Sequence, residues 1–530
     1  MRDAVRGAAT VIRAGKIISV FAAAIMAAVI CAAPVGQAFA AKGVDEALAA
    51  LARGYESRRV SADVGQRAST VVSFDTRIDG TLTDLVRRYG SKNIGNVISG
   101  VPSLDTLGSW WNALGDETLT ELIWQALRNN RDLQAATARV TEARATLGIS
   151  KAARLPWLDN SDSWTRSESS ENSTNKGASA EITKLSIDAS WEIDIFGGRR
   201  ESINAAAASL ESEHARLHSA WVTLSSEVAL NYLSLRTLQE RLDIAHRNLA
   251  LQEETLGMIK SRYEAGLSDS LALNQAYYTT SQTRAGIPPI LASIESTMNT
   301  LATLTGSVPG SLEESLSKRA SLPTPSSVNL VGIPAEALRQ RPDIRAAERA
   351  LAAQASRKKS AEKDLLPKFT LIGSIGLESL STGNLFSGGS FGFSFGPRIS
   401  LPIFHGEAIR RNIQVQEARE EQLLAAYEQA VLGAVAEVRN ALAANALELE
   451  RNKSLKTGMA AAQNALDVAR DKYSSGLTDF SNVIGAQQAL LSLEDQYTIS
   501  RGQMTSNIVR VFKALGGGWT PLTEELTHKR

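Results

Sequence analysis

A strict alternation of apolar and polar residues over Leu185–Phe196 constrains the fold more than any other stretch of this chain. Successive side chains of a β-strand point to opposite faces, so a period of two predicts a strand with one apolar and one polar face. Such a strand is typical of a sheet that meets lipid on one side and water on the other. The apolar positions are Leu185, Ile187, Ala189, Trp191, Ile193 and Ile195, and the polar positions are Ser186, Asp188, Ser190, Glu192 and Asp194.

After Gly197 and Gly198 the period changes from two to about 3.5, the repeat of supercoiled helices. No proline interrupts Arg199–Tyr263, and a helix over these residues, about 65 of them, would be roughly 100 Å long. Two apolar stripes run along it, which predicts packing neighbours on two sides, as in a closed ring of helices. The stripes are Leu210, Leu217, Leu224 and Leu238, and Val228, Leu235, Leu242, Leu249 and Leu256.

The chain then repeats itself at an offset of about 210 residues, which indicates a tandem duplication. The order of the matching motifs is conserved between the two copies. The matches are Arg131-Asp132-Leu133 with Pro342-Asp343-Ile344, Leu155-Pro156 with Leu366-Pro367, Phe196 with Phe404, and Tyr263-x-x-Gly266-Leu267-x-Asp269 with Tyr473-x-x-Gly476-Leu477-x-Asp479. Each copy is therefore expected to contain helices, a β-hairpin, one long helix, a turn and a returning helix.

The expected boundaries follow from these patterns. They are a signal peptide over 1–40, an N-terminal extension over 41–104, a first repeat over 105–308 with its hairpin at 157–196, a Pro/Ser-rich connector over 309–334, a second repeat over 335–516 with its hairpin at 368–404, and a tail over 517–530. Within the first repeat, Trp110–Leu155 is expected to be helical, and Pro288-Pro289 is expected to mark a kink or a helix start.

The first forty residues have a basic start, an apolar run and a small-x-small motif at Ala38-Phe39-Ala40, as a secretory leader does. An uncleaved anchor is one alternative. A lipoprotein is another, in which Cys31, the one cysteine, would carry the lipid. Past residue 40 no apolar run is long enough for a membrane helix, so further membrane contact would be made by strands. The net charge of +1 gives no reason to expect a nucleic-acid partner.

Four amphipathic strands cannot close a barrel, and an open sheet edge in lipid would leave backbone groups without hydrogen bonds. We therefore expect chains to associate. Three chains give twelve strands and a lumen wide enough for water, which suits the polar face with its charged residues. The predicted fold is an α+β membrane protein whose protomer, with four membrane strands and long coiled-coil-like helices, trimerises into a twelve-stranded β-barrel plus an α-helical barrel. The charged lumen residues are expected to be Asp188, Glu192, Asp194 and Arg398.

Taken together, the motifs resemble the outer-membrane factor (TolC-like) family of tripartite efflux systems, and in detail its NodT-type branch, which serves resistance-nodulation-division pumps. The resemblance covers roughly residues 105–520. The motifs are Trp110-Trp111, Asn130-Arg131-Asp132-Leu133, Trp191-Glu192-Ile193-Asp194-Ile195-Phe196-Gly197, Arg262-Tyr263-Glu264-Ala265-Gly266-Leu267, Arg341-Pro342-Asp343-Ile344, Pro402-Ile403-Phe404 and Lys472-Tyr473 with Gly476-Leu477 and Ala486-Gln487.

The resemblance implies a homotrimer in the outer membrane that extends into the periplasm, where a periplasmic adaptor (membrane fusion) protein and an inner-membrane pump of the resistance-nodulation-division type would be its partners. The periplasmic entrance and adaptor-docking region would be the two helix–turn–helix tips and the helix start after the second. The residues assigned to it are Tyr263, Gly266, Asp269, Tyr473, Gly476, Asp479 and Asn482.

Several of these assignments have a simpler structural alternative. Relatives usually carry aspartates where this chain has Asn482 and Gly485, so an acidic gate is in doubt and Asp479 is the nearest carboxylate. Asp479 and Asp269 can each be helix N-caps only. His214 and His218 share a helix face at metal-binding spacing, but without a third ligand a solvated helix face is the better interpretation.

The function expected from the sequence is passive conduction of small molecules from pump and adaptor across the periplasm and outer membrane. No cofactor and no enzymatic activity are expected, because no phosphate-binding loop, nucleophile elbow or metal cluster is evident. The alternatives are the exit duct of a one-step protein secretion system and a periplasmic helical scaffold that spans no membrane.

Overall fold

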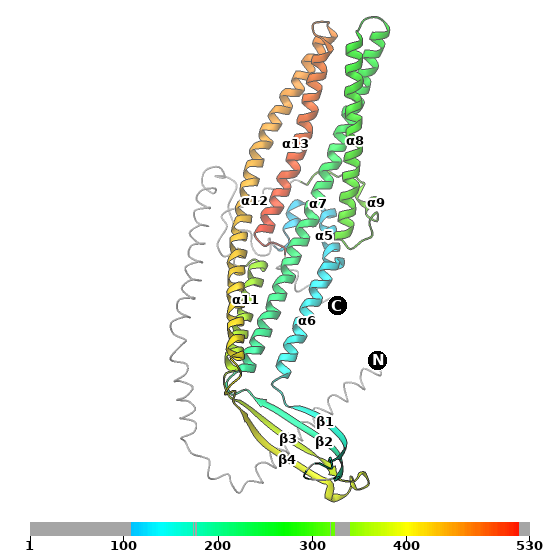
Figure 1. Ribbon diagram of the computed structural model, residues 1–530. Coiled ribbons are helices and arrows are strands. Elements are labelled where there is room, and N and C mark those ends of the chain that lie inside the picture. Colours follow the sequence, from blue (N-terminus) through cyan, green and yellow to red (C-terminus); the bar gives the residue numbers. More distant parts are fainter. Residues whose placement is uncertain (1–107, 173, 175–176, 319, 324–339, 519–530) are drawn as a thin grey trace, which may run out of the picture. The chain divides into compact units, whose positions relative to one another are not determined.

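The computed structural model describes residues 108–172, 174, 177–318, 320–323 and 340–518 (Figure 1). The expected leader with Cys31, the N-terminal extension, most of the connector and most of the tail lie outside these residues. The elements are η1 (Trp110–Leu114), α5 (Glu117–Asn129), α6 (Arg131–Ala152), β1 (Trp157–Glu168), β2 (Ser179–Ile193), α7 (Gly198–Glu264), α8 (Ser270–Leu304), α9 (Glu313–Leu316), α11 (Pro342–Lys363), β3 (Lys368–Ser379), η2 (Thr382–Asn384), η3 (Gly388–Ser390), β4 (Phe391–Ser400), α12 (Ala408–Ser474) and α13 (Phe480–Ala514).

The duplication is visible in the lengths of the elements. Helices α7 and α12 have 67 residues each, and the returning helices α8 and α13 have 35 each. Figure 1 shows α7 with α8, and α12 with α13, as two long helical hairpins that run away from the sheet. The heptad pattern placed the ends of α7 to within one residue. Among the described residues, none of the helices has the length and apolar character needed to cross a bilayer.

The expectation of one helical stretch over Trp110–Leu155 was wrong, and Pro288-Pro289 does not start a helix. The Trp110–Leu155 stretch is divided into η1, α5 and α6. Asn130 has extended backbone angles, and its side chain accepts a hydrogen bond from the Leu133 amide at 3.0 Å, so it ends α5 and caps α6. Conversely, α8 continues through Pro288-Pro289 without a break. The helix lies along α7, and this packing compensates for the hydrogen bonds that the prolines cannot make.

The four strands form one antiparallel sheet in the order β1-β2-β3-β4, which leaves β1 and β4 as its edges among the described residues. Strand β2 begins earlier and ends earlier than the alternation suggested, at Ser179 and Ile193 instead of Leu185 and Phe196. Strand β4 ends at Ser400, before the proline at 402 that would lack a ladder donor. Strand β1 begins at Trp157, the expected start of the hairpin, and ends at Glu168.

The cross-strand register places the apolar residues of β2, β3 and β4 on one face, which we call the outer face. Its aromatic residues on β4 are exposed, Phe393 by 78%. The outer face consists of Leu185, Ile187, Ala189, Trp191, Ile193, Phe369, Leu371, Gly373, Ile375, Leu377, Phe391, Phe393, Phe395, Pro397 and Ile399. Strand β1 differs, because Asn160, Asp162 and Arg166 lie on this side as well.

The main core lies around the middle of α7, where α5 and the C-terminal ends of α8 and α13 meet it. Trp110 stacks on Phe512 at 5.6 Å between ring centroids, and Trp111 packs edge-on against Trp110 at 5.8 Å. The described part of the expected connector contributes to this core through α9, because Leu316 is fully buried in it. The segment after the first repeat is therefore a packed element at its start.

The same junction occurs twice, once in each repeat. In the first repeat, the Asn130 side chain donates to the Leu304 carbonyl oxygen at 3.0 Å, at the C-terminus of α8. In the second, the Arg341 guanidinium donates to the Ala514 carbonyl oxygen, at the C-terminus of α13. Gly306 and Gly516 follow with φ of 71° and 74°, and a Cβ at Gly306 would collide with the backbone of Asn129. Two different side chains thus hold the end of a returning helix against the start of a short helix.

Candidate channel wall and entrance

The face opposite the outer face, which we call the polar face, contains Asp188. Asp188 lies in a cross-strand row with Asp159, Ser374 and Ser394. The Ser186 hydroxyl, next along the same face, contacts Asp188 Oδ2 and the Ser161 carbonyl oxygen at 3.2 and 3.1 Å. Hydroxyls and carboxylates therefore alternate across the centre of the sheet, a surface suited to water and not to hydrocarbon.

Glu192 and Asp194, also expected in the lumen, are tied to the start of α7. Glu192 forms an ion pair with Arg199 at 2.8 Å, and this hydrogen bond raises the pKa of the Arg199 guanidinium above its usual value. Asp194 lies beyond the strand, which corrects its expected place in the sheet. Its two oxygens accept the backbone N–H groups of Arg199 at 3.0 Å and Arg200 at 2.8 Å. It stabilises the helix N-terminus, where a carboxylate is favourable.

Arg398 lies on the polar face of the edge strand β4. Its row across the sheet contains Thr370 on β3 and Glu192 on β2. Two strand spacings separate Arg398 from Glu192, and Glu192 already has Arg199 as its partner. The structure therefore places Arg398 on the same face as Asp188 without joining the predicted residues into one cluster.

Three tryptophans on strands β1 and β2 lie on different faces of the sheet. Trp164 and Trp191 are on the outer face, near opposite ends of the strands, whereas Trp157 pairs with Ser190 on the polar face. The indole of Trp164 donates to Glu181 at 3.1 Å, and that of Trp191 donates to the Arg154 carbonyl oxygen at 2.8 Å. This arrangement, an apolar ring outward and a satisfied N–H, suits a membrane–water boundary for these two only.

The first tip, between α7 and α8, is a left-handed helix C-cap followed by a capped helix start. Gly266 has φ of 72°, and its amide donates to the Tyr263 carbonyl oxygen at 2.9 Å. The Asp269 side chain accepts the Ala272 amide at 2.8 Å. Gly266 and Asp269 thus have the turn and N-cap roles that their spacing indicated.

The second tip, between α12 and α13, repeats the turn but not the cap. Gly476 has φ of 70° and donates to the Tyr473 carbonyl oxygen at 3.0 Å. Asp479 occupies the N-cap position of α13, yet its side chain makes no capping hydrogen bond and is exposed. Asn482, one turn on, donates to the Thr478 hydroxyl at 2.7 Å. The N-cap interpretation therefore holds for Asp269 and fails for Asp479.

The tips contact each other through Tyr473, one of the expected entrance residues, and through Arg262 and Phe480, to which the sequence assigned no role. The Arg262 guanidinium of the first tip lies 5.2 Å over the ring of Tyr473 in the second, and Phe480 packs on that ring at 5.3 Å. Beneath them an apolar cluster joins both hairpins, with Ile259 on α7 fully buried. Tyr263 is 43% exposed. Contacts between the two hairpins leave no periodic pattern in the sequence. The one sequence signal for this contact is that Arg262 is a cation, which can pack on an aromatic ring such as Tyr473.

The two histidines on α7 do not form a metal site. Burial, His214 and Arg345 together lower the pKa of His218 to about 4, and burial with Arg144 lowers that of His214. Positive neighbours on both sides disfavour a bound cation. Within the described ranges, no three His, Cys, Asp or Glu side chains gather closely enough to hold a metal ion.

Comparisons with known proteins agree with this architecture. The family model described as "Outer membrane efflux protein" matches residues 122–307 and 333–517. The nodulation protein T of Rhizobium leguminosarum bv. trifolii is 30% identical over 79% of this chain and 90% of its own length. The toluene efflux pump outer membrane protein TtgF of Pseudomonas putida is 31% identical over 79% of this chain and 87% of its own length.

Solved structures give the same result. The outer-membrane channel OprN superimposes with a TM-score of 0.75 at 31% identity, covering 81% of this chain and 98% of the channel. CusC, a protein described as forming a transmembrane channel, superimposes with a TM-score of 0.69 at 28% identity, covering 76% of this chain and 93% of CusC. Sequence, structure and both sets of relatives lead to one conclusion: this chain belongs to the outer membrane efflux protein family, as a NodT-type outer-membrane factor that acts in efflux from the outer membrane and extends into the periplasm.

Proposed function

We propose that three copies of this chain form a passive duct through the outer membrane. The observation that supports it most is the sheet itself, with a polar face, an exposed apolar face, and strands β1 and β4 unpaired among the described residues. In hydrocarbon each unpaired edge group would cost several kcal/mol, so the edges must pair with other chains. Twelve strands from three copies leave room for a water-filled lumen, whereas eight strands from two copies would be filled by side chains.

The helical hairpins would continue this duct through the periplasm. Each chain supplies two long hairpins, and in a ring of three their tips would form the entrance. Leu267 and Leu477 at the two tips are 69% and 76% exposed, so each tip presents an apolar side chain to a partner. A periplasmic adaptor protein is the partner that fits this position, and an inner-membrane pump, of the resistance-nodulation-division type, would supply the energy. The protein itself would perform no chemistry.

Opening of the entrance would require the two hairpins of a chain to separate at their tips. In the structure they are held by the Arg262–Tyr473 contact and by the apolar cluster that includes Ile259 and Phe480. Separating them exposes this cluster to water, so the closed arrangement is the stable one in the absence of a partner. Contact with the adaptor would offset that cost by covering the exposed surface.

Conductance across a planar bilayer tests the duct. Purified protein should give discrete conductance steps, and their absence, even from a variant with weakened tip contacts, would contradict a duct and favour a scaffold. The cargo is tested in a deletion strain. Increased sensitivity to toxic small molecules with an unchanged set of secreted proteins would support efflux, and the reverse pattern would indicate protein secretion.

A further inference from the structure

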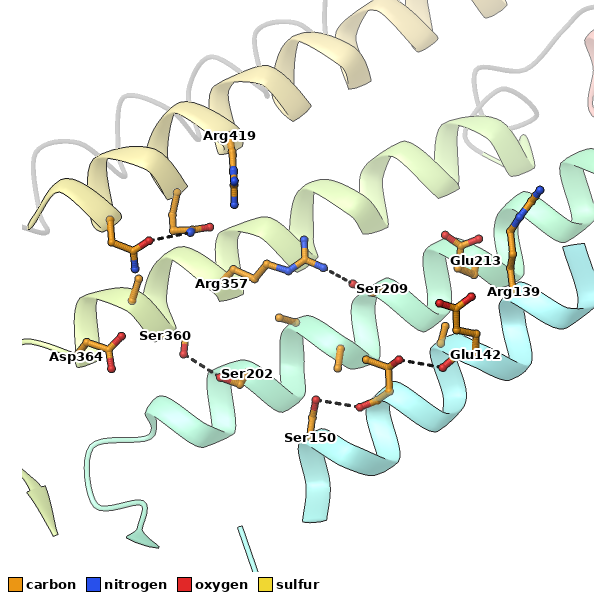
Figure 2. Close-up of a pocket in the computed structure, with 17 residues that line it drawn as sticks. Arg139, Glu142, Ser150, Ser202, Ser209, Glu213, Arg357, Ser360, Asp364 and Arg419 are labelled. Carbon is orange, nitrogen blue, oxygen red and sulfur yellow. Dashed lines mark hydrogen bonds between the residues drawn. The ribbon is translucent and has the colours of Figure 1, made fainter. Parts of the chain in front are cut away.

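Next to the sheet, a hollow of about 670 Å³ opens between α6, α7, α11 and α12 (Figure 2). A hollow of this size can hold a small organic molecule. Its floor is lined by small residues, Ala143, Ala205, Ala206 and Ala361, and its wall by Ser150, Ser202, Ser209 and Ser360. No established role of the family model or the relatives is attached to this place.

Two arginines enter the hollow from different helices. Figure 2 shows Arg357 reaching from α11 toward α7, and Arg419 reaching from α12 toward α11. The Arg357 guanidinium donates to the Ser209 hydroxyl at 2.9 Å and to Gln354 at 3.4 Å. Gln354 is 3% exposed and is itself fixed by hydrogen bonds to Gln416 on α12 at 2.9 and 3.1 Å. Arg357 is therefore held in place from behind by a buried side chain.

Neither arginine has a carboxylate partner in the part of the chain that the structure describes. The acidic residues of the lining are occupied elsewhere or balanced. Asp364 pairs with Lys368 at 2.9 Å and Glu213 with Arg216 at 2.7 Å, while Glu142 stands one turn from Arg139 on α6. Arg349, the next arginine along α11, has two carboxylates. The lining thus carries three arginines and three carboxylates, and among the described residues Arg357 and Arg419 form no ion pair with any carboxylate, while Arg357 lies against the Ser209 hydroxyl.

The hollow lies on the side of the helices that would face the duct. The four helices pack in the order α6, α7, α11, α12, each mainly on its neighbours, yet all four line one hollow. A hollow shared by every member of such a row lies on its concave side. If three rows close into a ring, as in the proposed function on which this step rests, the concave side is the inner wall.

We propose that Arg357 and Arg419 form a binding station for anionic solutes on the inner wall, one in each chain. Guanidinium groups recognise planar oxyanions, carboxylate above all, through paired N–H donors. The Ser209 hydroxyl, which accepts from Arg357, would donate to a further oxygen, and the alanine side chains of the lining would contact an apolar or aromatic body. The ligand class is therefore a carboxylate-bearing small molecule of amphiphilic character.

Dye binding to the purified full-length protein tests the station. The probe is 5-carboxyfluorescein, followed by fluorescence anisotropy, and the comparison dye is rhodamine 123, which has the same ring frame but a positive charge. We expect the double variant Arg357→Gln/Arg419→Gln to bind 5-carboxyfluorescein at least tenfold more weakly. The variant Arg349→Gln, whose arginine already has carboxylate partners, is the matched control and should stay within twofold. Lysine at 357 and 419 should retain only part of the affinity, because the charge is kept but the paired N–H donors are lost.

Equal binding by the double variant, or rhodamine 123 binding as tightly as 5-carboxyfluorescein, would overturn the proposal. Competition by inorganic phosphate and by phthalate distinguishes the sources of the anion. Displacement by both would assign the station to oxyanions in general, displacement by phthalate alone would assign it to carboxylates, and displacement by neither would overturn it.

Conductance of the same preparation separates this proposal from the duct. Dye binding that depends on the two arginines, without any conductance, would contradict the proposed duct and would still support the binding station. Conductance together with dye binding that is unchanged in the Arg357→Gln/Arg419→Gln variant would contradict the binding station and would not affect the proposed duct.

Discussion

Replacing Arg341 with methionine should loosen the end of α13 without unfolding the chain. The Arg341 side chain is only 8% exposed, and it joins three elements. Its guanidinium binds Asp343 at 2.7 and 3.0 Å, Glu437 on α12 at 2.8 Å, and the Ala514 carbonyl oxygen. Burial lowers the pKa of the guanidinium, and the two carboxylates more than offset this, so the arginine stays charged. Methionine has a similar length and keeps the apolar contacts.

The expected cost follows from what the substitution leaves behind. Removing one partner of a fully buried ion pair costs about 3–5 kcal/mol. Asp343 and Glu437 are each 40% exposed, so water can solvate them again, and we reduce the value to about 2–3 kcal/mol. At about 1.4 kcal/mol for each tenfold change, the local opening equilibrium should rise by roughly 30- to 150-fold.

Hydrogen exchange at the end of α13 measures this opening. The amides of Leu515, Gly516 and Gly517 donate to carbonyls of the last turn and should exchange faster by the same factor. Arg341→Lys keeps the positive charge but loses the paired N–H donors of the guanidinium, so it should increase exchange less than the methionine variant does. Arg349→Gln, on the exposed side of α11, should change exchange less than threefold. Exchange in the methionine variant that stays within threefold of the wild type would refute the reasoning.

Three further predictions concern other parts of the chain. Glu407 has φ of 64° at the start of α12, and Glu407→Gly should relieve about 1 kcal/mol of backbone strain. Loss of the exposed ion pair between Glu407 and Arg411 offsets part of this gain, so scanning fluorimetry should show a rise of about 1–2 °C in the melting temperature. An unchanged or lower melting temperature would contradict the strain. Tyr473→Ala removes the ring contact with Phe480 and the interaction with Arg262, which together stabilise the closed tips by about 2 kcal/mol. The open probability of the channel in bilayers should therefore rise at least tenfold, and an unchanged open probability would contradict the role of Tyr473 in holding the tips together. The pKa of His218 is lowered to about 4 in the folded protein, against 6.5 when unfolded. The contribution of neutral His218 to the free energy of unfolding is therefore fully present above pH 6.5 and decreases by about 1–2 kcal/mol as the pH falls toward 4. Denaturation curves of His218→Gln should lack this part of the pH dependence.

Most of the fold could be predicted from the local periodicity of apolar residues. The seven-residue repeat predicted α7, and the period of two predicted β2 with its two faces, because both patterns record which side of an element is buried or apolar. The internal repeat then predicted the second hairpin, β3 and β4. The alternation misled only at Asp194, where the residue pattern continues although the chain has already turned toward α7.

Contacts between distant segments could not be predicted in this way. Asn130 and Leu304 are 174 residues apart, and Arg341 and Ala514 are 173 apart, yet each pair closes a junction. The Arg262–Tyr473 contact joins different repeats, so neither residue shows in its own neighbourhood what it packs against. The same holds for Arg357 and Arg419, which lie on different helices and meet only around the hollow.

The most direct test is cysteine block of the conductance at two adjacent residues of β3. Ser374 lies on the polar face in the row of Asp188, and Ile375 lies on the outer face in the row of Ile187. In a background where Cys31 is replaced by serine, a charged thiol reagent should lower the conductance of Ser374→Cys in three steps, one for each chain. The same reagent should leave Ile375→Cys unaffected. Block at Ile375→Cys, no block at Ser374→Cys, or a number of steps other than three would contradict a water-filled barrel built from three sheets.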